Sequence, residues 1–167
     1  MWDKKSRFTV LVEAFSPDLY RYAFWLAGDK HTAEDLVQET FTRAWRSLDG
    51  LRDERAAKAW LMTTLRRENA RRFSRKSLER TDIDVDELEA TTHNENGLEV
   101  RALNKALRAL SRDYRDPLLL QIIGGFSVQD IAKEMNLTAG AVTTRLFRAR
   151  QKLRAALSDD DCREASG

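Results

Sequence analysis

The chain has 167 residues, 34% of them charged and 42% hydrophobic, and a formal net charge of +2. Only seven glycines and two prolines interrupt it, which favours an all-α protein of one medium domain or two small ones. It has no apolar signal segment, no run long enough to span a membrane and one cysteine, Cys162, so we expect a reducing, cytoplasmic location without membrane insertion.

The N-terminal part has the pattern of three or four helices. Ser16 and Pro17 resemble an N-cap followed by proline at the first helical position, which predicts that a helix begins there. Gly28 suits the position just after a helix C-terminus. A further helix is predicted to begin at Thr32, with Asp35 three residues later.

A loop is expected over residues 49–54, followed by a helix over about 55–75. Trp45 and Trp60 lie on the apolar faces of the helices on either side of this loop. Large aromatic side chains in such positions are usually buried. We therefore expect both to pack in the core instead of serving as platforms for nucleic-acid bases.

The composition changes sharply at residues 81–99, TDIDVDELEATTHNENGLE, which hold seven acidic residues and no basic one. Sparse hydrophobic residues and poor periodicity predict a flexible acidic linker over 77–99. The linker would separate an N-terminal domain (1–76) from a C-terminal one (100–157). The acidic end of the chain, 158–167, is predicted to be a disordered tail.

Helical periodicity returns at Val100, and Ser111 is placed to cap the next helix. Pro117 would lie inside that helix. Proline removes a backbone donor, so the sequence predicts either a kink or a shorter helix capped by Asp116.

Residues 126–154 predict a short helix, a tight turn and a longer basic helix. Ser127 and Asp130 have the spacing of a capping box, Asn136 tolerates a left-handed turn, and Thr138 can cap the second helix. Val142, Leu146, Ala149 and Leu153 then form one apolar stripe. This pattern is that of a helix-turn-helix.

The second helix of this motif has five basic and no acidic residues between 138 and 157. Its candidate DNA-contacting residues are Thr143, Thr144, Arg145, Phe147, Arg148 and Gln151. A major groove admits such a helix, and Arg148 suits bidentate binding of guanine. The alternative is that two packed amphipathic helices simply carry a solvated polar face.

Two further polar surfaces occur in the N-terminal part. The helix over about 55–75 and its extension are rich in arginine and lysine, including Arg66, Arg67, Arg71 and Arg72. The preceding helix presents a mixed polar face that includes Asp35, Gln38, Glu39 and Thr42. The helix dipole could account for either charge pattern. Functionally, the arginine-rich helix suits phosphate groups, and the mixed polar face suits a protein partner.

Three segments, AEDLVQETFTRAW (33–45), AWLMTTLRRENARRF (59–73) and the helix-turn-helix, together resemble the extracytoplasmic-function (ECF) class of bacterial sigma factors. The resemblance covers residues 8–157 and implies a factor that gives core RNA polymerase its promoter specificity. An anti-sigma factor is implied as a further partner.

The resemblance also implies a role for each surface. Asp35, Gln38, Glu39 and Thr42 would bind the β′ clamp of core polymerase, and residues 48–55 would capture a flipped base of the minus-10 element. Arg66, Arg67, Arg71 and Arg72 would hold the minus-10 DNA. The six helix-turn-helix residues named above would read the minus-35 element. The linker resembles the segment that threads through the polymerase cleft.

Two other functions stay open on the sequence alone: a sigma mimic that binds an anti-sigma factor without reading DNA, and an ordinary helix-turn-helix regulator. An enzyme is not expected, because His31 and His93 are isolated and no cofactor or metal-ligand spacing is present.

Overall fold

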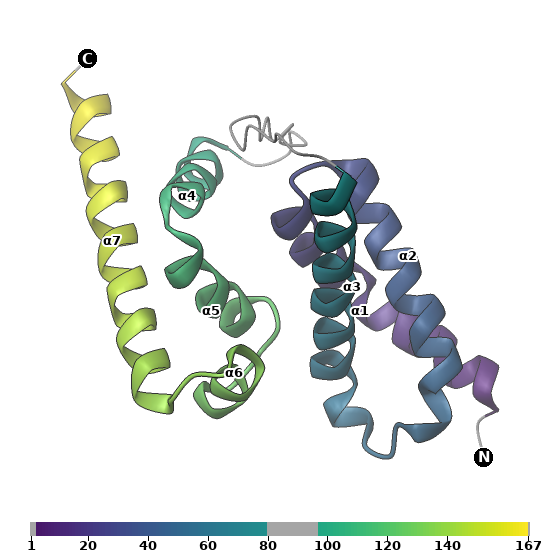
Figure 1. The fold of residues 1–167 in the computed structure, drawn as a ribbon. Coiled ribbons are helices and arrows are strands. Elements are labelled where there is room, and N and C mark those ends of the chain that lie inside the picture. The colour runs from purple at the N-terminus through teal and green to yellow at the C-terminus, as the bar shows by residue number, and fades with distance from the viewer. Residues whose placement is uncertain (1–2, 80–96, 167) are drawn as a thin grey trace. The chain divides into compact units, whose positions relative to one another are not determined.

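The computed structural model describes residues 3–79 and 97–166. The described residues form α-helices and short 3₁₀ turns with no strand, which confirms the predicted all-α class. The chain divides into two compact units, Met1–Thr91 and Thr92–Gly167 (Figure 1). Most of the predicted linker lies outside the described residues. None of the described helices is both long enough and apolar enough to cross a membrane.

Unit 1 contains α1 (Lys4–Ala27), α2 (Lys30–Ser47) and α3 (Ala57–Glu79), with 3₁₀ turns at Leu48–Gly50 and Glu54–Ala56. Each of the three helices packs against the other two. Their inward faces supply fully buried side chains, among them Leu19, Tyr22, Leu36, Leu61, Met62 and Leu65. The unit therefore has its own core, and the outward faces of the helices carry its charges.

The predicted helix start at Ser16 is wrong, because α1 continues through Pro17 to Ala27. The Ser16 hydroxyl donates to the Val12 carbonyl at 2.6 Å and therefore does not cap a new helix. Proline costs α1 one backbone hydrogen bond. Burial of Leu11 before it and of Leu19 after it favours one continuous helix. The prediction for Gly28 is confirmed: it ends α1 in a left-handed conformation, with φ 83°.

The predicted start of α2 at Thr32 is also wrong. Asp29 is the N-cap, since its carboxylate accepts a hydrogen bond from the Thr32 backbone N–H at 2.8 Å. Thr32 consequently lies in the first turn of the helix. Aspartate is the stronger capping residue of the two, which explains the choice.

The two tryptophans differ in their surroundings. Trp60 packs against the cluster of Leu11, Leu48 and Ala57, as predicted. Trp45 is 39% exposed, so the prediction that this ring packs in the core is wrong. It makes an edge contact with Phe8, with ring centroids 5.2 Å apart, and the Lys4 ammonium lies 4.8 Å from its centroid.

Unit 2 contains α4 (Leu98–Ala109), α5 (Arg112–Ile122), α6 (Val128–Met135) and α7 (Ala139–Ala165). Helices α4, α5 and α6 all pack against α7. The core side chains include Leu107, Leu118, Leu120, Phe126, Ile131, Val142 and Leu146. Gly124 is required at the turn after α5, because a Cβ there would lie 2.7 Å from the Leu120 carbonyl oxygen.

Helix α5 begins after Ser111 and passes through Pro117, so Asp116 is not its N-cap. Pro117 and the three leucines that follow are buried, and their burial favours continuation of the helix. The prediction of a disordered tail is wrong as well, since α7 extends to Ala165. Once a helix is nucleated, each added residue gains a backbone hydrogen bond. The Ser158 hydroxyl also bonds to the Arg154 carbonyl at 2.8 Å.

Candidate nucleic-acid interface

The α6–α7 pair has the local geometry of a helix-turn-helix. The Ser127 side chain accepts from the Asp130 N–H and the Asp130 carboxylate accepts from the Ser127 N–H, both at 3.1 Å, which completes the predicted capping box. Asn136 ends α6 with φ 54° and ψ 50°. The Leu137 N–H bonds to the Ala132 carbonyl at 2.8 Å, as in a Schellman motif. The Thr138 hydroxyl caps α7 at 3.1 Å. These bonds fix where α7 starts.

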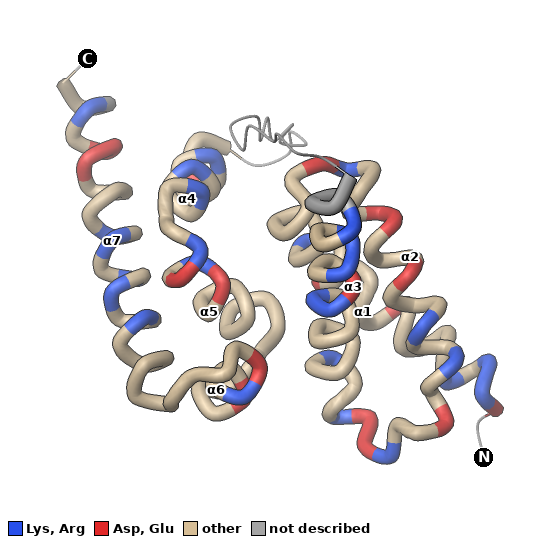
Figure 2. The backbone as a smooth tube through the Cα atoms, viewed as in Figure 1, with Lys and Arg blue, Asp and Glu red and all other residues tan. Residues whose placement is uncertain are grey.

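The predicted inner stripe of α7 is confirmed. Val142, Leu146 and Ala149 are at most 2% exposed, and Leu153 is half-buried. This burial turns the opposite face of α7 outward, where Lys and Arg are spread along the helix (Figure 2). Five of the six predicted contact residues are exposed on α7: Thr143, Thr144, Phe147, Arg148 and Gln151. Phe147 is 65% exposed.

The sixth predicted contact, Arg145, is half-buried, and its Nη1 lies 3.7 Å from the Asp113 carboxylate of α5. Arg150, next to the predicted set, donates to the Gln121 side chain. A hollow of about 390 Å³ is lined by Gln121, Val128, Thr143, Leu146, Phe147, Arg150, Gln151 and Arg154. The structure therefore brings five predicted residues to a free face and ties Arg145 to α5.

In unit 1 the four predicted polymerase-binding residues separate into two rows along α2. Asp35 and Glu39 are half-buried on the row that meets α3. Gln38 and Thr42 are exposed and line a hollow of about 480 Å³ between α1 and α2. The remaining lining of this hollow is mostly apolar: Phe8, Val12, Ser16, Val37, Phe41 and Trp45.

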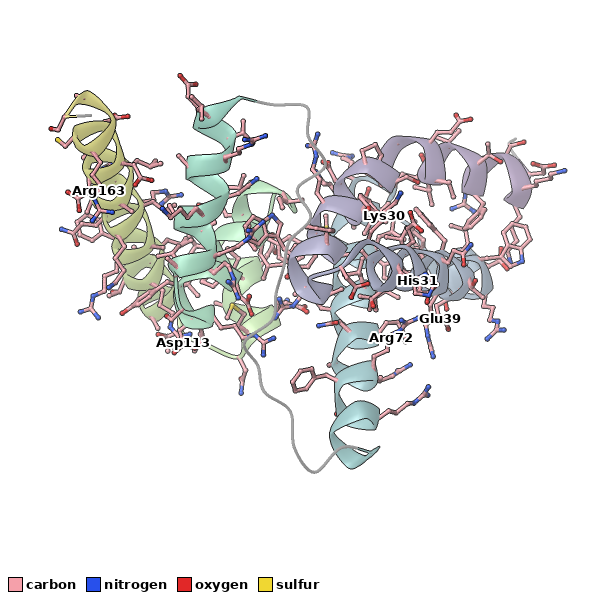
Figure 3. All side chains as sticks on the ribbon, turned by 90° about the horizontal axis from the view of Figure 1, so that it is seen from above. Lys30, His31, Glu39, Arg72, Asp113 and Arg163 are labelled. Carbon is pink, nitrogen blue, oxygen red and sulfur yellow. The ribbon has the colours of Figure 1, made fainter. Side chains whose placement is uncertain are left out.

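The row that meets α3 is an ion-pair network. The Asp35 carboxylate lies 3.6 Å from His31 Nε2 and 4.0 Å from Arg72 Nη1. His31 of α2 and Arg72 of α3, both labelled in Figure 3, thus approach the same carboxylate. Residues predicted to bind polymerase and residues predicted to bind DNA are thus in contact with each other.

The four predicted minus-10 arginines also have distinct surroundings. Arg67 is exposed, whereas Arg66 is half-buried and donates to the hydroxyl of the buried Tyr22. Arg71 donates to Glu68 at 2.8 Å. With Arg72 held near Asp35, three of the four guanidinium groups already have a partner within the chain. Only part of each group's five N–H donors is used by these contacts.

The segment at 48–55 is tied to the start of α1. The Lys4 ammonium lies 3.0 Å from the Asp49 carboxylate, and Arg7 donates to the Leu51 carbonyl at 3.2 Å. Arg7 Nε also lies 3.7 Å from the Glu54 carboxylate. The loop therefore has a defined attachment, which the sequence did not indicate.

Two features were missed by the sequence analysis. Glu68, which the sequence analysis did not single out, is buried between α2 and α3. A signal was available, because Leu61, Leu65 and Glu68 follow one another at i, i+4 and i+7, the spacing of a buried stripe. Asp113, the partner of Arg145, gave no such signal: it is 32 residues away in sequence, and only the packing of α5 on α7 brings it near.

Comparison with known proteins agrees with this division into two units. Residues 11–79 match the family model for Sigma-70 region 2, and residues 101–153 match that for Sigma-70, region 4. The chain is 35% identical over 158 residues to the ECF RNA polymerase sigma factor BldN of Streptomyces coelicolor, covering 90% of this chain and 60% of BldN. It is 33% identical over 147 residues to EcfG of Rhodopseudomonas palustris, covering 86% of this chain and 81% of EcfG.

Among solved structures, the chain is similar to the sigma factor RpoE of Bartonella quintana, determined in complex with the anti-sigma factor NepR. The TM-score is 0.74 at 30% identity, and the match covers 91% of this chain and 97% of RpoE. The two family models match consecutive parts of the chain, and EcfG and RpoE are matched over most of their own length. The chain belongs to the ECF sigma factors, the promoter-recognition subunits of bacterial RNA polymerase.

Proposed function

We propose that this chain binds core RNA polymerase through unit 1 and directs initiation at promoters whose minus-35 element is read by α7. The observation that carries the proposal is the exposed face of α7, where Phe147 and Arg148 project from a helix whose start is fixed by three caps. Major-groove reading needs a helix held rigidly with polar and basic side chains free on one side.

Unit 1 would supply the other two contacts. Gln38 and Thr42 beside the α1–α2 hollow offer a surface with an apolar floor and polar rim, which suits a protein partner such as the β′ clamp. Asp35 and Glu39 extend this surface toward α3. The arginines of α3 would bind phosphates of the minus-10 DNA, adding affinity without reading sequence.

An anti-sigma factor is proposed as a further partner. The support is the similar RpoE structure, in which the sigma factor is in complex with NepR. The protein would act in the cytoplasm as an initiation factor without catalytic activity of its own, since RNA synthesis belongs to the polymerase.

Two other functions were considered. A sigma mimic would not need a free cationic recognition face, and α7 presents one. An ordinary helix-turn-helix regulator would leave the match of residues 11–79 to Sigma-70 region 2 unexplained.

Run-off transcription with purified core polymerase and a promoter library tests the proposal against both alternatives. We expect initiation from a defined subset of promoters only when this protein is added. If no promoter yields a core-dependent transcript, the proposed function is refuted. Binding to an anti-sigma factor in that case would favour the mimic, and DNA binding without core would favour the regulator.

A further inference from the structure

Glu68 is the one charged side chain that is buried among the residues that the structure describes. It is 5% exposed, on the α3 row that also carries Leu61 and Leu65. Burying a carboxylate away from water is costly unless it is paired and hydrogen-bonded. Its presence in an apolar row therefore calls for partners, and the structure supplies two.

Both partners are arginines, and they approach the same oxygen. Arg71 Nη1, one turn along α3, donates to Glu68 Oε1 at 2.8 Å, and Arg43 Nε of α2 is in direct contact with Oε1. Arg43 Nε also lies 3.3 Å from the Glu39 carboxylate. The contacts thus run from Glu39 through Arg43 and Glu68 to Arg71. They join the α2 surface to the arginines of α3.

The two guanidinium groups are only partly covered, with side-chain exposures of 37% for Arg43 and 51% for Arg71. Arg71 can therefore bind Glu68 with one edge and present its remaining donors to solvent. A free arginine side chain samples many rotamers, and fixing it in one costs entropy at the moment of binding. A buried anchor removes part of that cost in advance.

Stability alone gives a weak reason for this arrangement. Replacing a buried ion pair or triad by apolar side chains of similar volume is often neutral or stabilising. The neighbouring Leu61 and Leu65 show that this row of α3 accepts leucine. What the ion-pair cluster provides, and an apolar row in its place would not, is a fixed orientation of Arg71.

We propose that Glu68 is a positioning residue that holds Arg71 in the orientation in which it binds a phosphate of the minus-10 strand. The inference rests on the proposed function, because it gives a task to one of the α3 arginines. It assigns to an acidic side chain a favourable role in DNA binding, which charge alone would not suggest.

The test is Glu68→Gln, measured in the reconstituted holoenzyme on a promoter selected from the run-off library. Glutamine keeps the size and an acceptor oxygen but loses the charge that anchors the guanidinium. Removing a negative charge near DNA should by itself strengthen DNA binding. If Glu68 positions Arg71, the substitution should instead weaken DNA binding. Open complexes should then form about fivefold less readily, which is the effect of weakening one charge-assisted hydrogen bond.

A second readout is the salt dependence of promoter binding. Loss of one phosphate contact should make the slope of log K against log salt shallower by about one. In an Arg71→Ala background, Glu68→Gln should have no further effect on open-complex formation, because the residue through which it acts is gone. Glu13→Gln, the same substitution at an exposed position of α1, is the charge-matched control and should behave as wild type.

The outcomes separate the two proposals. Failure of the wild-type protein to initiate with core polymerase would overturn the proposed function itself. If wild type initiates and Glu68→Gln equals or exceeds it, the positioning role is wrong. It is also wrong if the effects of Glu68→Gln and Arg71→Ala are additive. Thermal unfolding followed by circular dichroism, and core binding measured separately, distinguish a loss of promoter opening that comes from misfolding from one that comes from lost positioning.

Discussion

Leu146 and Phe147 are neighbours on α7 but differ in exposure, at 2% and 65%, and this difference separates the folding role of the helix from its binding role. Leu146→Ala removes a core side chain and should lower the free energy of unfolding of unit 2 by about 3 kcal/mol. Phe147→Ala removes a ring of which only about a third is buried. Burial of a whole phenylalanine is worth about 1.5–3 kcal/mol, so the loss of stability should be at most about 1 kcal/mol.

The expected effects on promoter binding differ from the effects on stability. Phe147→Ala should lower the affinity of the holoenzyme for minus-35 DNA about fivefold, the equivalent of about 1 kcal/mol for a lost apolar base contact. Thermal unfolding monitored by circular dichroism measures stability, and fluorescence anisotropy with labelled promoter fragments measures binding. A shift in melting temperature as large for Phe147→Ala as for Leu146→Ala would refute the reasoning, because Phe147 would then belong to the core. Unchanged promoter binding by Phe147→Ala would remove it from the DNA interface.

Three further predictions test other parts of the structure. Arg148→Ala should weaken minus-35 binding by about 1–3 kcal/mol and leave core-polymerase binding unchanged; equal losses in both binding assays would indicate a folding defect instead. Asn136→Ala should destabilise unit 2 by about 1 kcal/mol in thermal unfolding because alanine is disfavoured at a positive φ, whereas Asn136→Gly should not, and equal melting temperatures would contradict the left-handed cap. Asp29→Ala should destabilise unit 1 by about 1 kcal/mol. Thr32→Ala should have a smaller effect, since Thr32 contributes only its backbone N–H to the cap. A larger effect of Thr32→Ala would indicate that Thr32, and not Asp29, is the N-cap.

The amino-acid sequence alone determined the elements whose cause is local. The capping box at Ser127, the left-handed Asn136 and the apolar stripe of α7 follow from residue type and spacing within one or two turns, and all were predicted correctly. The same holds for the all-α class, because composition and helical periodicity are properties of the chain and do not depend on which helices meet.

The tertiary structure decided the features in which two local preferences compete or two distant segments meet. Ser16 and Pro17 favour a helix start, yet α1 continues through them because burying both Leu11 and Leu19 outweighs one lost hydrogen bond. The spacing of Glu68 from Leu61 and Leu65 indicates a buried position, but the sequence does not identify the arginines that pair with it.

The packing of α2 on α3 explains the environment of Glu68, since it brings Arg43 from 25 residues away to the Glu68 carboxylate. It also pairs Asp35 with Arg72, so that residues predicted for two separate interfaces form one network. Sequence periodicity identifies which face of a helix is buried. Which charges on two buried faces meet depends on how the helices cross, and that is a property of the folded chain.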